Sequence, residues 1–500
     1  MTPQLLLRFT LRVDFLTYLP RFESAFRDDY VYGIARFVEV FDTDRHSDES
    51  YCYQKMLEAG HFDCDPLATS SSDDESRTNW PWSPLSDTIS WMSAYRVAEA
   101  AIDDRTDSLG ELGQFIWKNP ELGFEETKAH DYIATYLESE GFQVTRNYIL
   151  PTAFRAEFGG PGPSVAILCE YDALPGIGHA CGHNLIAEGS VAVAVGVKAV
   201  LASRESTHVG RLVVLGTPAE ENGSGKQLLI DQGAFKDLDV AMMVHPAGMS
   251  ILRLMSIALV RDGCGDTMAG VTCGKQQTWR QEQHRVRVKR LPVAMIPPGV
   301  TYSCRCLLSG VTTNPKPCVI KRGGLSSNVI PDETEMEYRV RAPTTRELVT
   351  LMEKVKGCFL AAAEATGCTV TIDVPTPIVK HNVPNETLAR VFQKHGESLG
   401  MRFIDADPAD NIALGASTDA GNASHVLPLI HPLYDIRTKA LNHSEAFTEA
   451  AGTEAGHLET LKAAKALCFT VLDVLGNEKL LKDIKEEFHA KFNSTWAEKK

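Results

Sequence analysis

Residue types that could bind a metal gather in one glycine-containing segment, Glu170 to Asn184. Within it, Cys181 and His183 are two positions apart, so a turn could direct both side chains at one point. Thiolate and imidazole are both good ligands for zinc. An isolated Cys-x-His pair is more often a buried cysteine beside a hydrogen-bonded histidine, so a metal site here needs support from other segments.

Two neighbouring carboxylates, Glu220 and Glu221, provide that support. One carboxylate can bind a metal while its neighbour, held off the metal, moves a proton. Adjacent glutamates are usually solvated acids. Here they directly follow an apolar run and precede Gly223 and Gly225, which favours a shared pocket.

Two histidines complete the set. His245 follows a third apolar run, and His443 stands between Asn442 and Ser444 near the C-terminus. A lone histidine at either position is more often structural. Five candidate ligands are too many for one tetrahedral zinc and are typical of a two-metal site with a bridging solvent. The five are Cys181, His183, Glu221, His245 and His443, with Glu220 left over.

The elements that must position these residues follow from the hydrophobic pattern. Apolar strands are predicted over 165–169, 211–215 and 240–244, separated by helices over 185–201 and 224–235. Strands that alternate with helices imply a parallel sheet, and function in such sheets gathers at the C-terminal strand ends. Each predicted strand is followed at once by ligand-type residues, so we predict an α/β fold with one site at that edge.

Further elements are predicted on both sides of this core. A strand is expected over 335–340, and Thr344 to Glu347 forms a capping box for a helix that Gly367 can close. The remaining expectations are helices from Leu85, after Pro120, near Asn385 and from Glu454 to Leu475, and a strand over 369–374.

Composition excludes several kinds of partner. The 500 residues are 44% hydrophobic and 23% charged, as in globular proteins, and 50 basic against 65 acidic residues give a net charge of −15. This balance argues against nucleic acid and anionic membranes as partners. Glu188 and Lys198 interrupt the longest apolar run, so no membrane span is expected. Twelve scattered cysteines without a convincing signal peptide indicate reduced thiols and a cytoplasmic location.

Taken together, the motifs resemble the aminoacylase-1 and carboxypeptidase-G family of dinuclear metallopeptidases. The chain is most similar to its amidohydrolase branch, which includes auxin-conjugate hydrolases, aminobenzoyl-glutamate hydrolase and the β-alanyl dipeptidase-like "peptidase domain-containing protein 2" group. The resemblance spans about residues 85–252 and 320–476. The matching motifs are Asn119 to Glu126, Glu170 to Asn184, Thr217 to Glu221, Asn328 to Pro331 and Ser417 to His425.

The resemblance implies a role for each site residue. The five ligands named above would hold two divalent ions, zinc by default with manganese possible. Glu220 would act as general base and acid, and Asp172 would orient a metal ligand. Asn328 and Arg341 would contact the carboxylate of the substrate. Thr418, Asn422 and His425 could line the pocket, or could equally shape a glycine-rich loop.

The resemblance also implies the domain organisation. A catalytic α/β domain, split into 85–252 and 377–476, would have a mainly parallel sheet flanked by helices. An inserted α+β lid over 253–376 would mediate dimerisation. Residues 1–84 would be an N-terminal extension and 477–500 a polar tail. The expected function is a metal-dependent amidohydrolase or dipeptidase acting on a dipeptide or an N-acyl amino acid.

Residues 253–322 depart from the family's pattern. The family's lid histidine motif is missing, and His284, the one histidine between His245 and Asn328, has unmatched surroundings. A shifted reading frame and a true divergence both remain open. Losing an oxyanion donor costs on the order of a hundred- to a thousand-fold in turnover, so the alternative is a catalytically impaired homologue that binds metal or a partner. A redox or structural zinc protein is disfavoured because the cysteine spacing in this interval fits no paired zinc knuckle.

Overall fold

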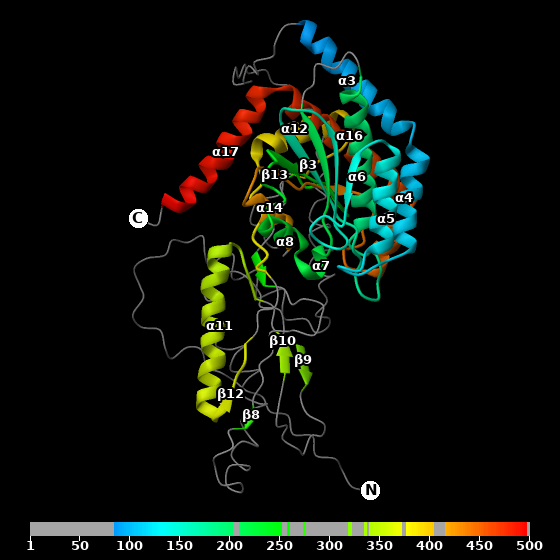
Figure 1. Cartoon of the computed structure of the whole chain (residues 1–500). Helices are drawn as coiled ribbons and strands as arrows, with labels where there is room; N and C mark the ends of the chain where they lie inside the picture. The colour runs from blue at the N-terminus through cyan, green and yellow to red at the C-terminus, as the bar shows by residue number, and fades with distance from the viewer. Residues whose placement is uncertain are drawn as a thin grey trace, which may run out of the picture. The chain divides into compact units, whose positions relative to one another are not determined.

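A six-stranded sheet with the strand order β1-β2-β4-β3-β5-β13 organises the chain (Figure 1). The computed structural model describes residues 85–203, 210–252, 258–260, 274–275, 319–322, 335–337, 340–372, 377–404 and 416–497. The expected N-terminal extension, 1–84, lies outside these residues, and α3 (Leu85–Asp103) begins where a helix is predicted.

The three predicted strands form the parallel centre of this sheet. They are β3 (Ser164–Cys169), β4 (Arg211–Gly216) and β5 (Val240–Met242), and β3 pairs in parallel with both others. β13 (Leu429–Ile430) adds a fourth parallel strand beside β5. On the other side, β2 (Phe154–Gly159) pairs antiparallel with β4, and β1 (Gln143–Arg146) antiparallel with β2. The predicted mainly parallel sheet is confirmed.

Both faces of the sheet are covered, which is why its central strands are apolar without alternation. On one face, Val165 and Ile167 of β3 join the larger core. This core includes residues of α3, α4 (Thr106–Lys118), α5 (Thr127–Ser139), α6 (His183–Leu201), α12 (Glu386–Ser398) and α16 (Glu454–Gly476). On the other face, Ala166 and Leu168 pack with residues of α8 (Gly225–Asp231) and α14 (Ala420–Ser424).

One helix among the described residues, α6, is long and apolar enough to cross a membrane. In the structure, 83% of its apolar window is buried inside the protein. α6 makes its most extensive helix contacts with α16 and α3. The apolar composition of α6 is therefore accounted for by its position against the sheet.

The described part of the insert at 253–376 contains both helix and strand. Its helix, α11 (Thr345–Thr366), begins with the predicted capping box and ends at Gly367, whose φ of 66° is left-handed. The short strand pairings are made partly by distant segments. β7 (Ala258–Val260) pairs with β11 (Val340–Ala342), β8 (Gly274–Lys275) with β12 (Cys368–Thr369), and β9 (Val319–Arg322) with β10 (Glu335–Glu337), all antiparallel. Of the strand predicted over 369–374, β12 contains only Thr369, residues 370–372 are not in a strand, and 373–374 lie outside the described residues. The role of the insert as a lid or dimer interface stays a prediction.

The C-terminal residues differ from the expected polar tail, since Glu478–Ala497 form helix α17. Leu480, Leu481 and Ile484 lie on one side of this helix and are buried in the larger core. Glu487 accepts hydrogen bonds from the backbone N–H groups of Glu386 and Thr387 and so caps the start of α12. The apolar face is short, and many charged residues surround it in the sequence. The composition of this segment alone therefore suggests a polar tail.

Ile484→Ala is expected to lower the free energy of unfolding by about 2–5 kcal/mol, because the side chain is fully buried in the core. The exposed neighbour Lys482 provides the matched control, and Lys482→Ala should change stability little. Denaturant midpoints of the two variants measure the difference. Equal midpoints would mean that α17 does not contribute to the core in solution.

Candidate metal centre

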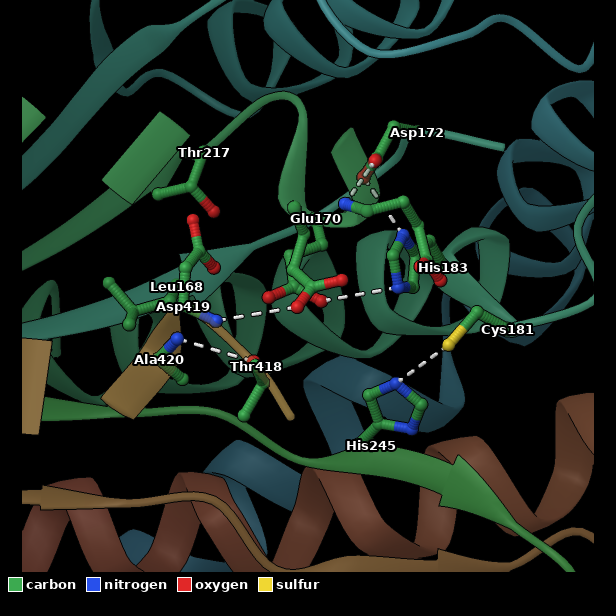
Figure 2. Close-up of polar contacts among 12 residues, drawn as sticks. Leu168, Glu170, Asp172, Cys181, His183, Thr217, His245, Thr418, Asp419 and Ala420 are labelled. Carbon is green, nitrogen blue, oxygen red and sulfur yellow. Dashed lines mark hydrogen bonds and ion pairs between the residues drawn. The ribbon is translucent and has the colours of Figure 1, made fainter. Parts of the chain in front are cut away.

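The carboxyl ends of the parallel strands bring the predicted ligands together. Figure 2 shows three of them, Cys181, His183 and His245. Glu170 and Asp172 follow β3, and α7 (Glu220–Gly223) begins four residues after β4 ends. β6 (His245–Ala247) follows β5 and pairs in parallel with β14 (Leu433–Asp435). Segments far apart in the sequence therefore meet at one edge of the sheet.

A tight turn places Cys181 and His183. Gly182, between them, has a φ of 79°, and a Cβ there would lie 2.6 Å from Cγ of Pro246. Only glycine fits without strain, so the turn can direct both side chains to the same region. His443 approaches from the far end of the chain, since its backbone N–H donates to the Ala180 carbonyl at 2.8 Å.

The ligand atoms form two groups that share one thiolate. Atoms of Cys181, His183 and His245 lie within 4.8 Å of one another, and so do atoms of Cys181, Glu221 and His443. Cys181 Sγ is 3.3 Å from His245 Nε2, and Glu221 Oε1 is 3.1 Å from His443 Nε2. Three protein ligands for each cation leave open positions for solvent and substrate, as in catalytic sites.

Hydrogen bonds to the Nδ1 atoms of His183 and His245 fix which ring nitrogen of each histidine faces the ligand groups. His183 Nδ1 donates to Asp172 Oδ1 at 2.9 Å, and His245 Nδ1 donates to the Pro246 carbonyl at 2.8 Å. The Nε2 atom of each ring is thereby turned toward the ligand groups. Asp172 Oδ2 also accepts from the backbone N–H of Glu221, at 2.9 Å. One carboxylate thus orients a ligand of each group, the position predicted for Asp172.

Asp172→Asn is expected to lower metal affinity or turnover about 10- to 100-fold, the usual effect of losing an outer hydrogen-bond partner. An amide cannot accept through both of its polar atoms, so it cannot satisfy His183 and the Glu221 N–H together. Calorimetric titration of the purified variant with metal measures the affinity. Unchanged affinity and unchanged turnover would contradict this role.

The electrostatics of the ligand groups suit cations. Burial and Glu221 raise the pKa of the Cys181 thiol, but His245, His183 and His443 lower it further, to about 6. Cys181 in turn raises the pKa of His443 to about 11, against the effect of burial. These mutual shifts favour a thiolate at Cys181 beside imidazolium groups. Metal ions would replace those protons, because thiolate, imidazole and carboxylate bind metal in their deprotonated forms.

The donor set fits two divalent cations. His183 Nε2 is buried and makes no hydrogen bond within the described structure, although Glu170 Oε2 lies 3.4 Å away. A nitrogen held in this way, with its opposite ring nitrogen bonded to a carboxylate, is the arrangement of a metal-bound histidine. The mixture of sulfur, nitrogen and oxygen donors is typical of zinc sites.

Glu220 belongs to neither of the two groups that share Cys181, but it forms a third group of ligand-type atoms with His183 and Glu221. Its carboxylate lies within 4.8 Å of the ligand atoms of His183 and Glu221, one ligand from each group. Its Oε1 accepts a hydrogen bond from the Asp419 backbone N–H at 3.3 Å. A carboxylate in this position could transfer a proton at a site that the ligand groups would hold.

The other predicted site residues lie outside the ligand groups. The amide of Asn422 is fully engaged, accepting from Lys380 N and donating to the Gln227 side chain and the Ile378 carbonyl, so it organises its own loop. His425 bonds the His381 carbonyl through Nε2. Thr418 is buried directly before Asp419, and Arg341 is half-buried on β11. Asn328 and His284 lie outside the described residues.

Two buried groups near the site are missing from the sequence predictions. His431 directly follows β13, and neither ring nitrogen makes a hydrogen bond among the described residues. Its ring centroid lies 5.5 Å from that of His245. A repeated signal could have revealed it, since Val-His-Pro at His245 and Ile-His-Pro at His431 both end an apolar run. Glu126, also buried, accepts from Ala219 N and Thr152 Oγ1 and so holds the turn before Glu220.

The fold and the two ligand groups define a metal-dependent hydrolase. The model of peptidase family M20/M25/M40 matches residues 166–465, which contain all five predicted metal ligands. The chain belongs to this family, and it is a hydrolase that acts on peptide or amide bonds. The family predicted from the motifs is confirmed.

Relatives support the same assignment. The chain is 42% identical to the mouse Xaa-Arg dipeptidase over 412 residues, 79% of this chain and 92% of that protein. It is 41% identical to the human Xaa-Arg dipeptidase with the same shares covered. It is 26% identical to a p-aminobenzoyl-glutamate hydrolase chain of Escherichia coli, with 79% and 94% covered.

A solved structure shows the same fold at lower sequence identity. It is the Bacillus subtilis YxeP protein, described as a dinuclear metal-binding peptidase of the M20 family. The TM-score is 0.53 at 19% identity, and the match covers 74% of this chain and 99% of that one. The likeness confirms the α/β architecture.

Proposed function

We propose that the chain is a dipeptidase that uses two divalent cations, zinc by default, and prefers arginine or another basic residue after the scissile bond. The observation that supports the chemistry is the pair of ligand groups sharing Cys181, with Glu220 beside one ligand of each. The relatives named Xaa-Arg dipeptidase, matched over most of their length, support the substrate class.

The residues would divide the work as follows. Cys181, His183 and His245 would hold one ion, and Cys181, Glu221 and His443 the other. When bound, the ions supply Lewis-acid activation of water and of the scissile carbonyl. Glu220 accepts the proton of the attacking water and passes it to the departing amine. The Asp419 N–H orients the Glu220 carboxylate for this transfer.

A substrate panel tests the proposal. The purified chain, loaded with zinc or manganese, is offered Xaa-Arg, Xaa-Lys and neutral dipeptides, an N-acyl amino acid and aminobenzoyl-glutamate. We expect the highest kcat/KM for the dipeptides with a C-terminal basic residue, and loss of hydrolysis on chelation with recovery when metal is restored. Equal rates on basic and neutral dipeptides would overturn the proposed preference.

The same panel decides the alternative of an impaired homologue. A folded chain that binds two ions per molecule yet releases nothing from any substrate would establish that alternative and direct attention to residues 253–322. The homodimer through the insert and the cytoplasmic location remain proposals too. Light scattering of the full chain and of a chain altered in α11 would test the dimer.

A further inference from the structure

Three buried charged side chains next to the metal centre have no part in the mechanism so far. Lys226 Nζ lies 2.5 Å from Glu170 Oε1 and 2.7 Å from Asp419 Oδ1. The Lys226 backbone N–H also donates to Asp419 Oδ2 at 3.0 Å. All three side chains are fully buried. One amine therefore ties the end of β3 and the start of α8 to the residue that precedes α14.

Stability alone does not account for this cluster. Removing three charges from water is costly, and a well-packed apolar cluster of the same volume is often as stable or more stable. Burial lowers the pKa of the Lys226 amine, but Asp419 and Glu170 raise it further, so the amine stays charged.

Both acidic partners of Lys226 also contact the catalytic centre, Glu170 through its carboxylate and Asp419 through its backbone N–H (Figure 2). The backbone N–H of Asp419 donates to Glu220 Oε1 at 3.3 Å. Glu170 Oε2 lies 3.4 Å from His183 Nε2, the ring nitrogen that faces the ligand groups. The Asp419 side chain accepts two bonds from Lys226, which fixes the direction of its own backbone N–H. The cluster thus connects the two halves of the split catalytic domain behind the base.

We infer that Lys226 is a positioning residue for hydrolysis. Through Asp419 it holds the carboxylate of Glu220 in place. It also holds the carboxylate of Glu170 against His183. This role rests on the proposed function. It makes Lys226 important for turnover through Asp419 and Glu170, and the amine also interacts electrostatically with Glu220.

Lys226→Met tests the inference in the metal-loaded full chain. We expect kcat to fall about 10- to 100-fold, as for loss of other outer-shell partners, with KM changed less than about three-fold and two ions retained. The control is Arg155→Met, which also removes a buried cation with two acidic partners, Asp237 and Glu157, that lie in neither ligand group. That variant should lose stability and keep kcat.

A double variant separates positioning from charge balance. Lys226→Met with Asp419→Asn removes an uncompensated buried carboxylate, so it should fold even where the single variant does not. If Lys226 positions Glu220, kcat stays low in the double variant. Recovery to the unmodified rate would overturn the inference and leave Lys226 as a counter-charge only.

If the unmodified chain cleaves nothing in the substrate panel, that inactivity overturns the proposed function but does not test the role of Lys226. A crystal structure tests that role separately. In a crystal structure of the Lys226→Met chain, the bond between Asp419 N and Glu220 Oε1 should be lost. A bond retained at its present length would show that Lys226 does not position the base.

Discussion

Glu220→Gln is expected to lower kcat by about 10²- to 10⁴-fold, the range that general acid–base groups contribute. The amide keeps the size of the side chain and can still accept from the Asp419 N–H, but it cannot take a proton from water. Since Glu220 is in neither of the two groups that share Cys181, both ions should stay bound. Steady-state kinetics and metal content of the same sample measure the two effects.

The adjacent carboxylate provides the matched control. Glu221 shares a ligand group with Cys181 and His443, so Glu221→Gln should lower metal content as well as turnover. Glu220→Gln would then lose turnover but keep its metal, whereas Glu221→Gln would lose bound metal as well as turnover. If Glu220→Gln lost metal to the same degree as Glu221→Gln, the assignment of Glu220 as the base would be wrong.

Cys181→Ala should remove more metal than any other single ligand substitution, because Cys181 is common to both ligand groups. Loss of an outer partner costs about 10- to 100-fold in metal affinity, and loss of a shared ligand should exceed that for both ions. Elemental analysis after dialysis against buffer should find neither ion retained, and hydrolysis should be undetectable at sub-millimolar metal.

Substitutions of ligands that belong to a single group provide the comparison with Cys181→Ala. His245→Ala and His443→Ala each remove one donor from one group, so each should weaken one ion and leave the other. A Cys181→Ala chain that still holds one ion tightly would show that the thiolate belongs to one group only. Thermal unfolding of the three metal-free variants checks that the comparison is among folded proteins.

The sequence by itself determined the ligand types and the elements that carry them. Cys181, His183, Glu221 and His245 follow short apolar runs that alternate with helices, a pattern that predicts parallel strands, and parallel strands end at one edge. The Asn442 to Glu445 segment added His443, which indicates a ligand only when it is counted together with the other four. The capping box at Thr344 depends only on residues close together in the sequence, so it can be predicted from the sequence alone.

Tertiary structure decided how those residues are connected. That Cys181 is shared by two groups depends on the left-handed turn at Gly182 and on a hydrogen bond between residues 180 and 443, which no periodicity encodes. Asn422 is committed to its own loop, and α17 completes the core through three apolar residues in a charged segment. The Lys226 cluster joins residues 170, 226 and 419, because burying a charge requires partners from wherever the fold brings them.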